Sequence, residues 1–133
     1  MPRGLSTAVP KSKQHKSAAA RHLRAYRATV HSHPEWAAVM LFYAALHVLE
    51  AAFDAEGVHN ETHGSRELYI KQRHKVAWAP YHRLQTESMK ARYLQGGAFA
   101  LSARSVEAEL RRVKFAAVRA YCRQLLGSAR AQG

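Results

Sequence analysis

One long apolar segment, from Trp36 to Phe53, constrains this chain more than any other feature. Nearly all of its residues are Ala, Val, Met, Leu or Phe. The polar exceptions are spaced by four, three and four residues, which places them within an arc of roughly 60° on one helix face. Polar groups in an apolar helix cost free energy unless they are paired. We therefore expect a buried central helix with one polar stripe, made of Tyr43, His47, Glu50 and Asp54.

A polar segment rich in histidine follows this helix. The chain turns at Gly57 and then offers His59, His63 and Arg66, which we expect to fold back over the polar stripe. Imidazole and guanidinium groups next to buried carboxylates are typical of functional sites. The candidate catalytic residues are therefore His47, His59, His63 and Arg66.

Three interpretations of this cluster remain open. The two loop histidines are four residues apart, a spacing that suits a metal on a helix, but residues 57–64 have the composition of a loop. Alternatively, a neutral His takes the proton from a ribose 2′-hydroxyl while Arg66 stabilises the charge on phosphorus, which cleaves RNA without metal. In the third interpretation the stripe residues hydrogen-bond one another and clamp the loop onto the fold. We expect no bound metal and no cofactor.

The charge of the chain is concentrated at its two ends. The formal net charge is +12, yet all nine acidic residues lie between Glu35 and Glu109, where eight Lys and Arg nearly balance them. Residues 1–34 carry seven Lys and Arg without an acid, and residues 110–133 carry six. Such ends suit a polyanion, most simply nucleic acid. The alternative is a solvated basic surface without a defined partner.

The basic residues form two rows that become one stripe if the first and last helices are neighbours. Arg92 adjoins Tyr93, a pair that suits a phosphate and a stacked base, although Tyr93 also fits as a core aromatic residue. The candidate nucleic-acid-binding residues are Lys11, Lys13, Lys16, Arg21, Arg24, Arg27, Arg92, Arg111, Arg112, Lys114 and Arg119.

Cysteine usage and hydropathy indicate the compartment. The single cysteine, Cys122, excludes an internal disulfide, and its helical context predicts a small core residue in a reducing compartment. The first sixteen residues lack the apolar run of a secretory signal. The apolar segment approaches the length of a membrane span, but His47 and Glu50 argue against that role. We expect a cytoplasmic protein without a membrane partner.

The pattern along the chain predicts helices only. We expect a flexible basic arm over residues 1–15, a helical domain over 16–127 and a tail over 128–133. Caps and breakers, namely Ser32 with Glu35, Pro34, Gly57, Pro80 and Gly127, divide the domain. The expected helices are Ser17–Val30, Pro34–Glu56, Ser65–Val76, Tyr81–Leu94 and one from Ser102 or Ser105 to Leu126, with Val106, Leu110, Val113, Ala117, Tyr121 and Leu125 as its buried row.

Helices of this number and length, joined by short loops, predict an all-α fold, an antiparallel bundle of four to five helices. The central helix is apolar nearly all round, and a chain of 133 residues has difficulty covering it alone. We therefore expect a homodimer.

Two segments, FYAALHVLEAAFDAEGVHNETHGSREL (42–68) and YHRLQTESMKARY (81–93), resemble the HEPN group of small helical bundles over about residues 34–126. The resemblance implies a dimerising bundle that binds nucleic acid, with RNA as the first expectation, or serves as an adaptor subunit of a defence, toxin–antitoxin or mobile-element system, with a further protein partner. Alternatively, it implies a metal-independent endoribonuclease. The R-x(4–6)-H motif of active members is missing from its usual late position, since no Arg from residue 66 onward precedes a His at that spacing.

Overall fold

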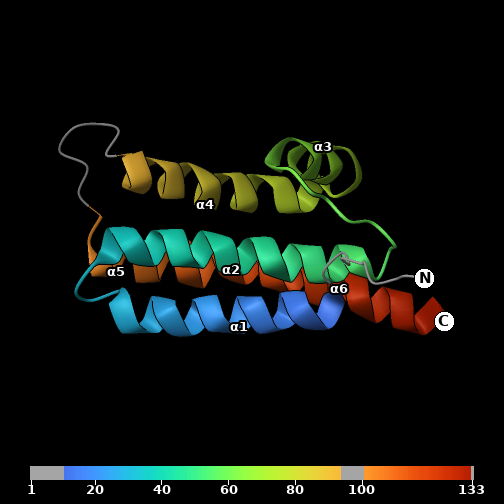
Figure 1. Cartoon of the computed structure of the whole chain (residues 1–133), viewed down its shortest axis with the longest axis horizontal. Coiled ribbons are helices and arrows are strands. Elements are labelled where there is room, and N and C mark those ends of the chain that lie inside the picture. Colours follow the sequence, from blue (N-terminus) through green and yellow to red (C-terminus); the bar gives the residue numbers. More distant parts are fainter. Residues whose placement is uncertain (1–10, 94–100, 133) are drawn as a thin grey trace, which may run out of the picture.

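The computed structural model describes residues 11–93 and 101–132, and all secondary structure within these ranges is helical (Figure 1). This confirms the all-α class. The last three elements form one continuous helical rod, whose middle part is π-helical. In chain order the elements are α1 (Ser12–Thr29), α2 (Pro34–Asp54), α3 (His63–Arg73), α4 (Lys75–Tyr93), α5 (Ala103–Ser105), η2 (Val106–Phe115) and α6 (Ala116–Gln132).

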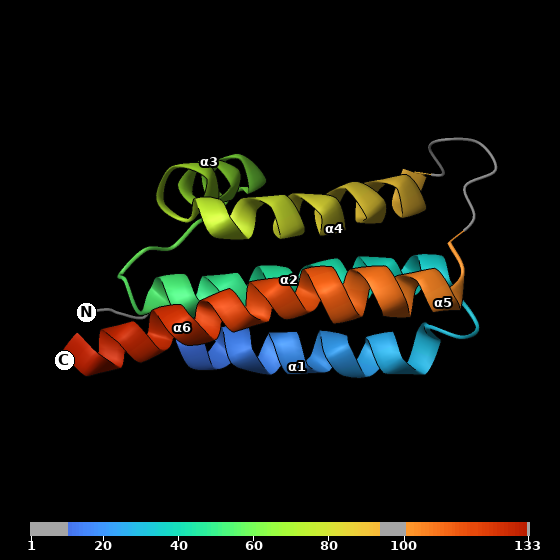
Figure 2. The same cartoon turned by 180° about the vertical axis from the view of Figure 1, so that it is seen from behind.

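Helix α2 lies at the centre of the molecule, with α1 along one side and α4 along the opposite side (Figures 1 and 2). The η2–α6 rod covers a further side and contacts both α2 and α4. Successive long elements run in opposite directions, and the short α3 packs against α4 (Figure 1). The helices therefore form an antiparallel bundle around α2.

The apolar composition of α2 explains its central place. Leu41, Leu49 and Phe53 are fully buried, and burying such side chains contributes about 1.5–3 kcal/mol each. Pro34 begins the helix, where its missing N–H costs nothing, and Gly57 adopts φ of +75° in the turn that follows. One chain thus covers most of α2, which removes part of the reason for expecting a dimer.

The first residue of α1 and the N-cap of α2 differ from the prediction. Helix α1 starts at Ser12 instead of Ser17, because the Gln14 side chain accepts from the Lys11 N–H and Asp54 accepts from the Ser12 N–H at 2.9 Å. The expected arm is thus helical from residue 12, and residues 1–10 lie outside the described ranges. The capping box expected at Ser32 and Glu35 is wrong, since α2 begins after His33 without a side-chain cap. The inner face of this first helical segment, formed by Ala19, Leu23, Tyr26 and Val30, is buried.

Helix α4 begins at Lys75, so Pro80 lies inside it instead of starting it. Proline removes one backbone hydrogen bond, and Val76, four residues earlier, is 74% exposed, so water reaches the carbonyl group left without a donor. After this proline, Tyr81 and Leu84 are buried. In the preceding helix α3, Ile70 is buried, whereas Leu68 is exposed.

The final rod begins as predicted but continues differently. Ser102 caps it by accepting from the Ser105 N–H at 3.0 Å. In η2 the buried side chains Leu110 and Phe115 are five residues apart, as the wider π-helical turn requires. The row expected from a regular α-helix is therefore wrong at Val113 and Ala117, which are exposed, whereas Tyr121 and Leu125 are half-buried against the core. Val113 is 53% exposed. Gly127 does not end the rod, which continues to Gln132.

Candidate functional site

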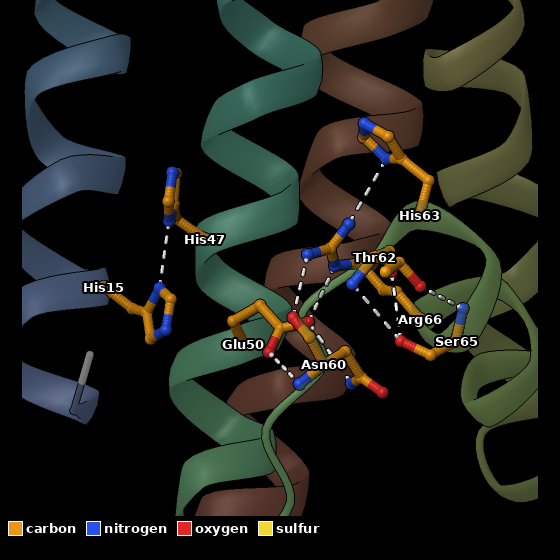
Figure 3. Close-up of polar contacts among 8 residues, drawn as sticks. All are labelled: His15, His47, Glu50, Asn60, Thr62, His63, Ser65 and Arg66. Carbon is orange, nitrogen blue, oxygen red and sulfur yellow. Dashed lines mark hydrogen bonds and ion pairs between the residues drawn. The ribbon is translucent and has the colours of Figure 1, made fainter. Parts of the chain in front are cut away.

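A buried ion pair joins the polar stripe of α2 to α3. Arg66 Nε donates to Glu50 Oε2 at 2.7 Å, and both side chains are at most 9% exposed (Figure 3). Asn60 completes the network, because its backbone N–H and its amide nitrogen donate to Glu50 and its carbonyl accepts from Arg66. Each charge is thus paired and hydrogen-bonded, as burial requires. The segment after Gly57 is therefore clamped onto α2, as the third interpretation of the sequence expects. That interpretation is wrong about the partners, because Tyr43 bonds Arg92, His47 contacts His15 and Glu50 bonds Arg66 and Asn60, each outside the stripe.

Local sequence explains how Arg66 reaches this place. Thr62 caps α3 by accepting from the Ser65 N–H at 3.0 Å, and the Ser65 hydroxyl lies close to the Thr62 N–H in return. This capping box fixes the first turn of α3. His63 and Arg66 fall on one face of that turn, and His63 Nδ1 lies 3.3 Å from an Arg66 terminal nitrogen.

His47 lies apart from this group and faces α1. Its Nδ1 is 3.0 Å from Nδ1 of His15 (Figure 3). Its ring also stacks on His22 with centroids 5.5 Å apart. Burial, followed by the positive charges of His15 and His22, lowers the pKa of His47 to about 4. Sequence reasoning did not select the two α1 histidines, although their spacing of seven residues places them on one helix face.

His59 lies apart from both the Glu50–Arg66 pair and His47. Its Nε2 contacts Asp54 at 3.3 Å, next to the start of α1. The four predicted catalytic residues therefore divide into three sets, and only His63 and Arg66 come together. In the part of the chain that the structure describes, no three His, Cys, Asp or Glu side chains are arranged to hold a metal. The His59–His63 pair considered as a metal site in one interpretation is divided, since His59 contacts Asp54 and His63 lies against Arg66.

A pocket of about 190 Å³ opens beside His63. It lies between α2, α3 and α4, and Arg92 contributes a second cationic group while its guanidinium donates to the Tyr43 hydroxyl at 3.1 Å. Gln85 and Glu67 line another part and hydrogen-bond each other at 2.9 Å. Since Nδ1 of His63 faces Arg66, Nε2 remains for a ligand. A histidine and an arginine on one small pocket can transfer a proton and stabilise a phosphate charge.

The predicted basic rows meet on the other side of the bundle, because α1 lies next to the η2–α6 rod (Figure 2). Arg27 and Arg111 line one hollow between them, and Lys16 and Arg119 line another. Burial and the positive charges of nearby arginines, including Arg123, lower the pKa of Arg119. Cationic groups thus converge here. Other predicted positions, Lys11, Lys13, Arg21, Arg24 and Arg112, are exposed, Lys114 is half-buried, and Arg92 belongs to the separate His63 pocket.

Two further features concern the core. Cys122 is 2% exposed, and burial raises its pKa to about 12, which fits the structural role predicted for it. Helix α2 has the length and hydropathy of a membrane span, and 72% of its most apolar window is buried within the bundle. The central helix of a soluble bundle has the same two properties.

No family model matches this chain, and comparison with curated proteins and with solved structures gives no significant match.

Proposed function

We propose that this protein is a nucleic-acid-binding module, with RNA as its first candidate ligand and the groove between α1 and η2–α6 as its binding surface. The observation that carries the proposal is the convergence of Arg27, Arg111, Arg119 and Arg123 from two helices far apart in sequence. Like charges held this close repel one another unless an anion compensates them. Glu107 lines the hollow of Arg27 and Arg111 and lies 3.9 Å from Arg111, so it compensates part of this charge, and the remaining positive charge favours an external anion. A phosphate backbone supplies such anions in a row.

A salt titration of binding tests this proposal. In Arg27→Gln/Arg119→Gln we expect affinity for a fluorescein-labelled single-stranded RNA to fall at least tenfold, and the slope of log affinity against log salt to fall by about 1.4, since each phosphate contact contributes roughly 0.7. Arg73→Gln/Lys75→Gln removes the same charge from the exposed side of α3 and α4 and serves as the control. Equal losses in both variants would reject the groove as the binding surface.

We also propose a HEPN-like bundle that dimerises or docks as an adaptor in the cytoplasm, within a defence, toxin–antitoxin or mobile-element assembly. Support comes from the all-helical order and from Trp36, which is 51% exposed at the start of the apolar helix. Light scattering coupled to size exclusion, with Trp36→Ser as the variant, gives the mass of the particle. A monomer at all concentrations in the wild type would reject the dimer.

A second function, metal-independent RNA cleavage, is favoured by the shared pocket of His63 and Arg92 beside Arg66. In this proposal His63 moves the proton and the arginines stabilise the charge on phosphorus. Cleavage of an RNA pool in EDTA is expected to disappear in His63→Ala and to persist in His47→Ala, because His47 faces α1. Cleavage that survives in His63→Ala would exclude this site, and no cleavage by the wild type would leave the binding role alone.

A further inference from the structure

An apolar pocket of about 240 Å³ lies between α1, α2 and α6, on a different side of the bundle from the His63 pocket. Its walls are aliphatic, and Ala19, Ala20 and Ala51 leave the space that larger side chains would fill. Among the residues that the structure describes, no aromatic side chain lines it. A nucleobase usually binds on an aromatic surface, so these walls fit an alkyl chain better than a base.

Three cationic side chains border this pocket, namely Lys16 from α1 and Arg119 and Arg123 from α6. In the part of the chain that the structure describes, none of the three forms an ion pair. The Arg119 guanidinium lies 5.0 Å over the Phe115 ring, which holds it near the pocket edge. An anionic group at the edge would thus find positive charge without displacing a carboxylate.

We propose that this pocket binds a small anionic amphiphile, a straight-chain carboxylate of about six to ten carbons, with its chain against Ala20 and Leu126 and its head group among Lys16, Arg119 and Arg123. The pocket volume corresponds to about eight methylene groups at roughly 30 Å³ each, close to the volume of one water in the liquid. The carboxylate accepts charge-assisted hydrogen bonds from the arginines.

The proposal predicts a dependence on chain length. Each methylene group that leaves water tightens binding about two- to fourfold, so octanoate should bind about four- to sixteenfold more tightly than hexanoate. The gain should stop once the chain exceeds the pocket. Octanol, which has the same chain without the charge, should bind at least tenfold more weakly than octanoate.

Calorimetric titration of the full chain with sodium butanoate, hexanoate, octanoate and decanoate below their micelle concentrations tests this. Ala20→Leu fills the pocket from an exposed position of α1 and should weaken octanoate binding at least tenfold, whereas Ala28→Leu, also exposed on α1, should not. Arg119→Gln/Arg123→Gln provides a second test that leaves the apolar walls intact. Amide NMR shifts should centre on residues 19, 20 and 126.

Three results would overturn the proposal: octanoate that does not saturate, equal binding of octanoate and octanol, or unchanged binding in both pocket variants. Octanoate binding by a protein that does not bind RNA would uphold the pocket and reject the proposed function. If both ligands bind, they should compete, because Arg119 serves both surfaces.

Discussion

Acid should destabilise this protein through His47. The pKa of His47 is lowered from 6.5 to about 4, so the unfolded chain binds a proton at this residue more readily than the folded chain does. Stability is therefore fully present above pH 6.5 and is lost as the pH falls towards 4. Other groups act on this histidine: His15, His22 and Arg21 on α1 and Arg66 on α3 all oppose its protonation.

The size of the effect follows from the two pKa values. Between about pH 7.5 and about pH 5, one such histidine removes about 2 kcal/mol from the free energy of unfolding. His47 is only partly buried, and screening by solvent reduces this to about 1 kcal/mol as a lower expectation. Burial also lowers the pKa values of His15 and His22, so their loss has the same sign.

Urea unfolding followed by circular dichroism at these two pH values measures the effect. His47→Gln removes the titrating group while keeping a polar side chain next to His15. The pH-dependent loss of unfolding free energy should shrink by about 1–2 kcal/mol in this variant. His33→Gln, at an exposed position, is the control and should behave as the wild type. An unchanged pH dependence in His47→Gln would refute the assignment of the effect to this side chain.

The remaining predictions concern the buried pair, the π-helical segment and two glycines, and all are measured as free energies of unfolding in urea. Arg66→Met should cost about 3–5 kcal/mol, because it leaves the Glu50 charge buried and unpaired. The double variant with Glu50→Leu should recover most of this loss, and equal stability of the single and double variants would contradict the pairing. Phe115→Ala should cost about 3–5 kcal/mol, and a loss below about 1 kcal/mol would show that the regular α-helical row is correct. Gly57→Ala should destabilise by about 1 kcal/mol and Gly127→Ala should stabilise by a similar amount, since only Gly57 has a positive φ; the same sign for both would argue against these conformations.

The fold could be predicted from apolar patterns that extend over whole helices. The exact helix ends could not be predicted from single capping or breaking residues. The apolar run of α2 and the inner face of α1 have a repeat that only buried helices satisfy. Ser32 and Pro80 carry ordinary capping and breaking signals, but His33 instead of Ser32 is the N-cap of α2, and α4 extends through its proline. The π-helical turns of η2 could not be predicted, because nothing in the apolar pattern distinguishes a spacing of five from a missed position.

The candidate site shows where sequence spacing stops being informative. The polar stripe predicts that Glu50 and His47 lie on one helix. Although they are only three residues apart, they contact different helices: Glu50 pairs with Arg66 on α3, and His47 contacts His15 on α1. The partner of each side chain depends on which helix packs beside it. His15, which contacts His47, lies 32 residues earlier in the sequence, so the spacing within α2 could not reveal it. The pairing of Glu50 with Arg66 neutralises the one buried acid of the stripe. On the pocket side Glu67 is engaged in a hydrogen bond with Gln85, and the Arg92 guanidinium beside His63 supplies the positive charge that a phosphate ligand needs.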